Sequence, residues 1–186
     1  MPRLTKTTTR RGDDGSTDLA DGTRIAKDAP RMQVIGALDE LTSVIGLALS
    51  FSPQPQRVEE LRRIQNDLFH LGALFARPDA AAHAEGPRVT QQRIDELERK
   101  IGSLQEELGP LENFLLPGGS NNAAALHLAR AVCRRAERDL VALARTEPVE
   151  KFSAVYLNRL SDLLFLLARA ENKSAGIPET LWDSRK

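Results

Sequence analysis

Residues 116–143 read LPGGSNNAAALHLARAVCRRAERDLVAL, and they predict the architecture of the whole chain. When the residues after Ser120 are placed at helical intervals of about 100°, six apolar side chains fall in one stripe. The stripe consists of Ala125, Leu128, Val132, Ala136, Leu140 and Leu143. The stretch therefore predicts a long helix that follows the non-helical Leu116-Pro-Gly-Gly-Ser120 and buries this stripe in a core.

Four further segments repeat apolar residues at the same spacing, and turn signals separate them. We expect helices from 28–30 to about 50, from 55 to 75, from a Thr90 cap to 108, and from just after Pro148 to about 174. The predicted core residues are Ile35, Leu38, Ile45, Leu49, Val58, Leu61, Ile64, Leu68, Leu71, Phe75, Ile94, Leu97, Ile101, Leu104, Leu157, Leu160, Leu164 and Leu167. The pattern predicts an all-α fold, a five-helix up-and-down bundle of ferritin-like architecture, left-handed in packing if it follows the usual ridge geometry.

The chain of 186 residues suits a single domain, 1–186. Residues 1–28 are rich in Thr, Gly, Asp and Arg without periodicity, so we expect a loop there. We call this segment the head; the bundle follows at 29–175 and a C-terminal tail at 176–186. No strand pattern of comparable quality is visible, and 76–89 is predicted to be a loop.

Charge and cysteine content restrict the environment and the partners. Acidic and basic residues number 26 each, which gives no reason to expect nucleic acid as a partner. The single Cys133 cannot form an internal disulfide, which fits a reducing, cytoplasmic location. Residues 1–11 carry no apolar run, and no later stretch approaches the length of a membrane span, so we expect a soluble protein.

The predicted fourth helix carries a second, charged face. Steps of four and three residues bring Arg130, Arg134 and Glu137 to one quadrant, with Arg138 beside them. One interpretation is a solvated face with an ion pair between Arg134 and Glu137. The other is a phosphate site, because arginines bind phosphate oxygens bidentately and a carboxylate among them fixes their orientation.

The head and the fifth helix offer further polar residues. Residues 9–17, TRRGDDGST, with Lys27 could wrap phosphates as a nest of backbone N–H groups, although a flexible tail would look alike and no Walker loop is present. Asn158 and Asp162 share a helix face near Lys151, a position that is usually solvated. The three histidines lack metal-ligand spacing and no Glu-x-x-His pair suggests a di-iron site, so we expect no protein-bound catalytic metal.

At these residues the sequence resembles the cob(I)alamin adenosyltransferases of the propanediol-utilisation type, a family of trimeric five-helix bundles. The resemblance spans nearly the whole chain and rests on six motifs in the family's order. They are TRRGDDGST at 9–17, Lys27-Asp28 with Pro30-Arg31, GALDEL at 36–41, LPGGS at 116–120, RAVCRRAER at 130–138 and YLNRLSD at 156–162.

The resemblance implies a site residue by residue. The implied nucleotide contacts are Thr9, Arg10, Arg11, Gly12, Thr17, Asp18, Lys27, Arg134, Arg135, Glu137, Arg138 and Asn158. Arg130 and Asp39 match a pair that bridges subunits, and Phe114 matches an aromatic residue set against the lower face of the corrin; with Arg134 these form the implied catalytic set. Two departures stand out: Arg11 replaces the family's usual Thr or Asn, which could alter phosphate or Mg²⁺ contacts, and Thr42 replaces Asn or Ser in a helix.

The implied reaction is attack by cob(I)alamin on C5′ of ATP, which displaces triphosphate and forms adenosylcobalamin. The resemblance also implies Mg²⁺, a homotrimer, a flavin-dependent reductase, an adenosylcobalamin-dependent enzyme that receives the product, and an apolar lower face that removes the axial ligand. No protein nucleophile is needed, which agrees with the lack of any catalytic dyad. The alternative is a non-catalytic chaperone of the same fold that delivers nucleotide or adenosylcobalamin to a mutase; a plain helical scaffold would have no reason to carry the glycine-rich head.

Overall fold

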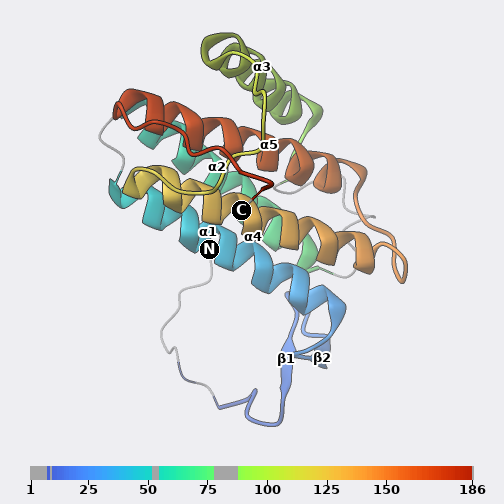
Figure 1. Cartoon of the computed structure of the whole chain (residues 1–186). Coiled ribbons are helices and arrows are strands. Elements are labelled where there is room, and N and C mark those ends of the chain that lie inside the picture. The colour runs from blue at the N-terminus through green and yellow to red at the C-terminus, as the bar shows by residue number, and fades with distance from the viewer. Residues whose placement is uncertain (1–7, 9, 52–54, 78–87, 186) are drawn as a thin grey trace.

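Five helices and one short hairpin form the chain, as the computed structural model shows for residues 8, 10–51, 55–77 and 88–185 (Figure 1). The helices are α1 (Pro30–Phe51), α2 (Pro55–Phe75), α3 (Gln91–Leu108), α4 (Asn121–Leu143) and α5 (Lys151–Ser174). All five predicted helices are confirmed, with ends within about two residues of the expected ones. The segment 76–89 falls mostly outside the described residues.

The bundle is organised around α4 and α5. α1 packs on α4, α4 on α5, and α3 on α5, while α2 packs on α1. α3 therefore lies at the outer edge of the bundle (Figure 1). All four leucines predicted to be buried on α5 are fully buried: Leu157, Leu160, Leu164 and Leu167. This arrangement exposes one face of α4, the face that carries the charged residues.

The predicted stripe on α4 is confirmed at five of its six positions, and Leu128 is the exception. The side chain of Leu128 is 50% exposed, whereas Leu126 and Cys133 are fully buried. α4 touches both α1 and α5, so its buried arc turns toward Leu126 and Cys133 and leaves Leu128 outside its edge. The prediction for Leu128 was wrong because a single stripe does not show how many neighbours a helix has.

Two helix starts use side-chain caps and one does not. Ser120 accepts a hydrogen bond from Ala123 N at 3.1 Å, and Glu150 accepts one from Ser153 N at 3.0 Å. Thr90 occupies the N-cap position of α3, but its side chain makes no capping hydrogen bond. Thr90 therefore stands where the cap was expected, but its side chain does not cap the helix.

The head contains a β-hairpin, which corrects the expectation of a loop. Strands β1 (Ser16–Asp18) and β2 (Arg24–Ala26) pair antiparallel, with Thr17 opposite Ile25. The turn between them holds Gly22 at a φ of 87°, a conformation that glycine adopts without strain. Ala20 N donates to Ala76 O at 2.8 Å, so the hairpin is fastened to the end of α2.

The C-terminal tail pairs with the link between α3 and α4. Leu115 and Leu181 form an antiparallel bridge, and Trp182 N donates to Phe114 O at 2.7 Å. The ring of Trp182 meets that of Phe114 edge to face, with centroids 6.1 Å apart. The tail thus supports the backbone of the link that carries Phe114.

One described helix, α1, is long and apolar enough to cross a membrane by length and composition, with a mean hydropathy of 1.6 over its best window. The expectation that no stretch approaches the length of a span was wrong for this helix. About a third of the window is buried in the fold, where α1 packs against α4 and α2. A core helix passes the same test, so the match is weak evidence for a membrane.

Candidate functional site

The exposed face of α4 carries Arg134, Glu137 and Arg138 close to α5. Glu137 accepts a hydrogen bond from the side-chain amide of Asn158 at 3.0 Å, and Arg138 donates to the backbone oxygen of Arg134 at 3.1 Å. The ion pair between Arg134 and Glu137, expected for a merely solvated face, is not among the ion pairs of the described residues. The Arg134 side chain has no polar partner in the described part of the chain, so its donors are available to a ligand.

Arg135 lies on the other side of α4 from Asn158. Its guanidinium forms an ion pair with Glu40 on α1, so the side chain that was assigned to the nucleotide is engaged within the bundle. The structure therefore brings Arg134, Glu137, Arg138 and Asn158 together and leaves Arg135 apart from them.

Arg130 and Asp39 do not meet within one chain. The guanidinium of Arg130 lies 5.4 Å from the ring centroid of Phe165, a cation–π arrangement on the α5 side of α4. Asp39 is exposed on α1 and has no ion pair among the described residues. Each charge is therefore available for a partner outside the chain.

Phe114 stands at the rim of a pocket of about 510 Å³. The pocket is lined by the link 111–117 and by side chains of α4 and α5, namely His127, Arg130 and Phe165. The Phe114 side chain is 76% exposed, so it is not a core anchor of the described chain. An exposed phenylalanine beside a largely apolar pocket is suited to lie against a flat apolar ligand.

His127 is a buried wall of the Phe114 pocket. Burial, together with the positive charge of Arg130, holds the pKa of His127 below its ordinary value of 6.5. The ring of His127 lies 6.0 Å from that of Phe165, which further encloses it. The imidazole is therefore neutral near pH 7 and adds a polar but uncharged group to the pocket.

The head is held in shape by its own charges. Arg24 forms ion pairs of 3.1 Å with both Asp14 and Asp18, and Arg11 pairs with Asp18 at 3.1 Å. Hydrogen bonds from Ser16, with help from Arg24, lower the pKa of Asp14 to about 2, so this carboxylate stays ionised. The hairpin is thus ordered by a small ion-pair network together with the buried side chain of Leu19 in its turn.

Gly12 and Lys27 approach each other closely across the head. A Cβ at Gly12 would lie 2.9 Å from Lys27 Nζ and 3.0 Å from Ser16 O, so only glycine fits without movement. Arg10, just before this turn, has a φ of 60°, which is unusual for a residue other than glycine. Thr17 is paired in β1, and Thr9 lies outside the described residues.

Sequence reasoning missed several residues of this region. Arg24 organises the head, while Trp182, Phe165 and His127 surround Phe114 or its pocket. The lone tryptophan of the chain, placed near the end of the tail, was a signal for one of them. Phe165 and His127 gave none, because the residues around Phe114 are distant from them in sequence, and Arg24 gave none because the hairpin that brings it to Asp14 and Asp18 was not predicted.

Two alternative catalytic groups, a cysteine nucleophile and a protein-bound metal, find no support among the described residues. Burial raises the pKa of the Cys133 thiol, which donates to Leu157 O, so the thiolate nucleophile does not form. No group of three His, Cys, Asp or Glu side chains among them could hold a metal ion. The arrangement is suited to binding an anion beside a flat apolar ligand.

Comparison with known proteins gives a consistent result. The family model described as "Cobalamin adenosyltransferase" matches residues 7–171. A cobalamin adenosyltransferase of Cupriavidus metallidurans is 43% identical over 185 residues, which cover 99% of this chain and 97% of the relative. A corrinoid adenosyltransferase of Mycobacterium leprae is 44% identical over 176 residues, which cover 91% of this chain and 92% of the relative.

Solved structures resemble the chain over nearly its full length. A variant of the PduO-type ATP:corrinoid adenosyltransferase from Lactobacillus reuteri, in complex with cobalamin and ATP, has a TM-score of 0.90 at 33% identity and covers 96% of this chain and 97% of its own. A second variant from the same organism, in complex with ATP, has a TM-score of 0.86 at 34% identity and covers 95% of this chain and 100% of its own.

Proposed function

The chain belongs to the cobalamin adenosyltransferase family, and on that premise we propose that its α4 face binds the triphosphate of ATP beside a corrin held at Phe114. The protein is a corrinoid adenosyltransferase. It moves the 5′-deoxyadenosyl group of ATP to Co(I) of cob(I)alamin, releases triphosphate and forms adenosylcobalamin.

The observation that carries the site assignment is the order of groups along α4. Arg130 borders the Phe114 pocket, and Arg134 follows one turn later, about 6 Å along the helix axis. A corrin in the pocket thus lies next to a cation that can take the leaving triphosphate. The cobalt attacks C5′, the C5′–O bond breaks, and its electron pair leaves with the triphosphate, whose charge the arginines stabilise.

The residues of the site have distinct proposed roles. Arg134 and Arg138 bind phosphate oxygens, and Glu137 with Asn158 holds this face of α4 in register with α5. The head supplies Lys27 and the backbone around Gly12 as a cover for the nucleotide. The remaining proposed contacts are Thr9, Arg10, Arg11, Thr17, Asp18 and Arg135, of which Arg135 must leave Glu40 to reach a phosphate.

Mg²⁺ is proposed to accompany ATP rather than to occupy a protein site. The described residues hold no cluster of carboxylate, imidazole or thiolate ligands for it, whereas a triphosphate offers the hard oxygen ligands that Mg²⁺ prefers. When bound, the ion would neutralise charge on the leaving group. Arg134 and Lys27 then need to supply only part of that compensation.

A homotrimer is proposed as the active form, with the nucleotide between neighbouring subunits. Asp39 and Arg130 each lack a charged partner among the described residues, and each is exposed enough to meet the other across an interface. Light scattering at micromolar concentration is expected to give three times the chain mass. A fully active monomer would defeat this proposal.

The electron donor and the enzyme that receives the product are also proposed. Co(I) is strongly reducing, so the protein requires an electron donor, which we take to be a flavin-dependent reductase in the cytoplasm. The product suits an adenosylcobalamin-dependent enzyme as receiver. Delivery to that enzyme as a chaperone is compatible with the same pocket and remains a second role rather than a replacement for catalysis.

The decisive experiment follows the reaction directly. The protein is incubated with ATP, Mg²⁺ and chemically reduced cobalamin, and the absorbance change to a light-sensitive alkylcobalamin is recorded. Triphosphate is measured in parallel, and one equivalent per alkylcobalamin is expected. Release of ADP or AMP without formation of alkylcobalamin would contradict displacement at C5′.

A further inference from the structure

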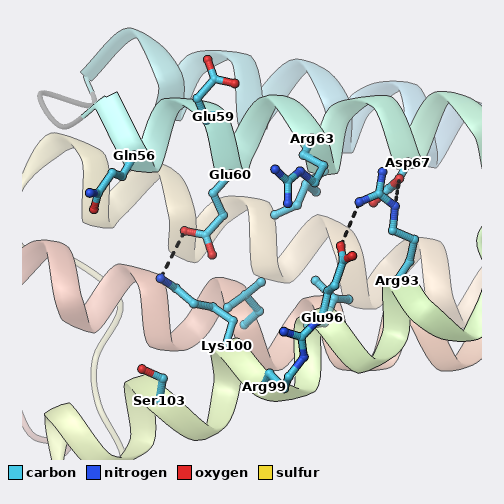
Figure 2. Close-up of a pocket in the computed structure, with 13 residues that line it drawn as sticks. Gln56, Glu59, Glu60, Arg63, Asp67, Arg93, Glu96, Arg99, Lys100 and Ser103 are labelled. Carbon is cyan, nitrogen blue, oxygen red and sulfur yellow. Dashed lines mark hydrogen bonds and ion pairs between the residues drawn. The ribbon is translucent and has the colours of Figure 1, made fainter.

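A second hollow, larger than the Phe114 pocket, lies between α2 and α3 (Figure 2). Its volume is about 700 Å³, and its floor is formed by the buried side chains of Ile64, Leu97 and Leu163. The groove exists because α2 packs on α1 and α3 packs on α5, so these two helices line a common space. None of the residues proposed for the reaction lines it.

The inward carboxylates of this groove already have cationic partners. Glu60 lies 3.9 Å from Lys100 Nζ, and Glu96 lies 2.8 Å from a guanidinium nitrogen of Arg93 (Figure 2). Arg93 also approaches the buried carboxylate of Asp67 at 3.4 Å, and burial raises the pKa of Asp67. The negative charge that faces the groove is therefore largely compensated.

Two cations in the groove lack such partners. The guanidinium groups of Arg63 on α2 and Arg99 on α3 make no hydrogen bond or ion pair with any described residue, although both side chains line the hollow. Figure 2 shows that they stand on opposite walls, while Glu59 points away from α3. Glu59 has Arg62 as its nearest cation, at 4.0 Å on the outer side of α2. The groove thus presents the exposed guanidinium groups of Arg63 and Arg99, which make no hydrogen bond or ion pair with a described residue, across a small apolar floor. The hydrogen bond from Arg93, with help from the charge of Arg63, lowers the pKa of Glu96 in the same groove.

We infer that this groove binds a small polyanion, whose oxygens bridge Arg63 and Arg99. Guanidinium groups hold phosphate and carboxylate oxygens bidentately, so both kinds of anion fit the same pair. Inorganic triphosphate, which the reaction releases, and a tricarboxylate metabolite are the two sources of this chemistry. An apolar floor of three side chains is too small to hold a protein partner by itself.

The bound anion would join two helices that otherwise touch little. α3 lies at the edge of the bundle, so a bridge from Arg99 to Arg63 is expected to raise the melting temperature and to slow hydrogen exchange in α3. The effect does not depend on the adenosyl transfer. It is therefore measured without ATP and cobalamin, and its failure leaves the proposed reaction untouched.

The test titrates the full chain with citrate at constant ionic strength, and records the melting temperature and hydrogen exchange of α3. Inorganic triphosphate forms the second arm, in Arg134→Ala protein, so that binding at the proposed nucleotide site is weakened. Each of Arg63→Gln and Arg99→Gln is expected to weaken binding by roughly tenfold or more. Arg62→Gln, one residue away on the outer side of α2, is the matched control and should bind as the parent does.

The double variant separates a site from general salt stabilisation, since excluded anions stabilise folded proteins without binding. Loss of the response in the double variant, with Arg62→Gln unaffected and basal turnover unchanged, supports the site. If only citrate or only triphosphate raises the melting temperature, that anion is identified as the kind of ligand that the groove binds. An equal rise of the melting temperature in the double variant, or no rise above the ionic-strength control, overturns the inference.

Discussion

The side-chain amide of Asn158 donates to Glu137 Oε1 at 3.0 Å and so joins α5 to α4 beside the proposed phosphate site. The amide oxygen of the same residue accepts from Arg159 at 2.7 Å, which fixes its orientation. The Glu137 carboxylate therefore binds a side chain of α5 and not Arg134. Arg134, one turn before it, keeps its donors free.

Arg134→Ala is expected to weaken ATP binding and to lower turnover while the helices stay folded. A guanidinium bound to phosphate contributes about 1.5 to 3 kcal/mol, which corresponds to a loss of roughly tenfold to a hundredfold. Calorimetric titration with ATP and circular dichroism test the two halves of the prediction. Arg145→Ala, in the exposed turn after α4, is the matched control. Unchanged kinetics for Arg134→Ala would mean that Arg134 is only a solvated surface residue and does not bind phosphate.

Asp39 and Arg130 are expected to behave as a coupled pair between subunits. Loss of either charge should reduce turnover about as much as loss of both, because either change removes the same bridge. A double-mutant cycle on kcat/KM, with the oligomer mass measured for each variant, tests this. Additive losses of kcat/KM would show that Asp39 and Arg130 act independently and would contradict the proposed bridge between subunits.

Phe114→Ala should leave stability nearly intact, because a side chain that is 76% exposed contributes little to the core. A buried phenylalanine would instead cost about 3 to 5 kcal/mol. Turnover should collapse when cob(II)alamin must be reduced on the protein and should largely recover with pre-reduced cob(I)alamin. Early melting together with normal turnover from cob(II)alamin would place Phe114 in the core of the assembly.

Gly119→Ala is expected to destabilise the start of α4. A Cβ there would lie 2.0 Å from Asn172 Oδ1, which accepts from Ser120 N at 2.9 Å, and the φ of Gly119 is 106°. Overpacking and a positive φ each cost about 1 to 3 kcal/mol, so we expect a loss of about 2 to 6 kcal/mol in urea unfolding. Gly102→Ala on α3 meets nothing within 4 Å and should be neutral or stabilising, and an equal loss in both variants would contradict the steric argument.

His127 should make stability depend on pH in mildly acidic solution. Its pKa is lowered in the folded chain by burial and by Arg130, while Glu179 opposes the shift, so the unfolded chain binds the proton more tightly. The free energy of unfolding is therefore expected to fall as pH drops below about 6.5. His127→Gln should flatten the difference between urea unfolding at about pH 5 and about pH 7.5. An unchanged slope in His127→Gln would disprove the assignment.

The helices could be predicted from the sequence because each carries its own apolar period. The PGGS turn at 117–120, the Pro55 start of α2 and the Gly109 end of α3 mark boundaries that depend on nearby residues alone. The β-hairpin of the head was missed because its strands are three residues long, too short for alternation to show. Leu128 was misplaced because burial on α4 depends on two neighbouring helices.

The site was less accessible to sequence reasoning than the fold. Helical spacing grouped Arg134 with Glu137, yet the structure joins Glu137 to Asn158 on the next helix instead. Arg134 and Arg135 are adjacent in sequence, yet Arg135 pairs with Glu40 whereas Arg134 has no ion pair among the described residues. Such choices depend on how helices are placed around α4, which a periodic pattern does not describe.

The position of α1 against α4 sets the order in which the chain can fold on the ribosome. α1 packs more extensively on α4 than on α2, and Val34, Leu41 and Ile45 are fully buried. These side chains leave the exit tunnel before α4 is synthesised, and at roughly 5 to 20 residues per second the wait lasts about 4 to 14 seconds. The growing chain therefore exposes its most apolar helix for seconds, and any fragment that stops short of α4 is expected to aggregate.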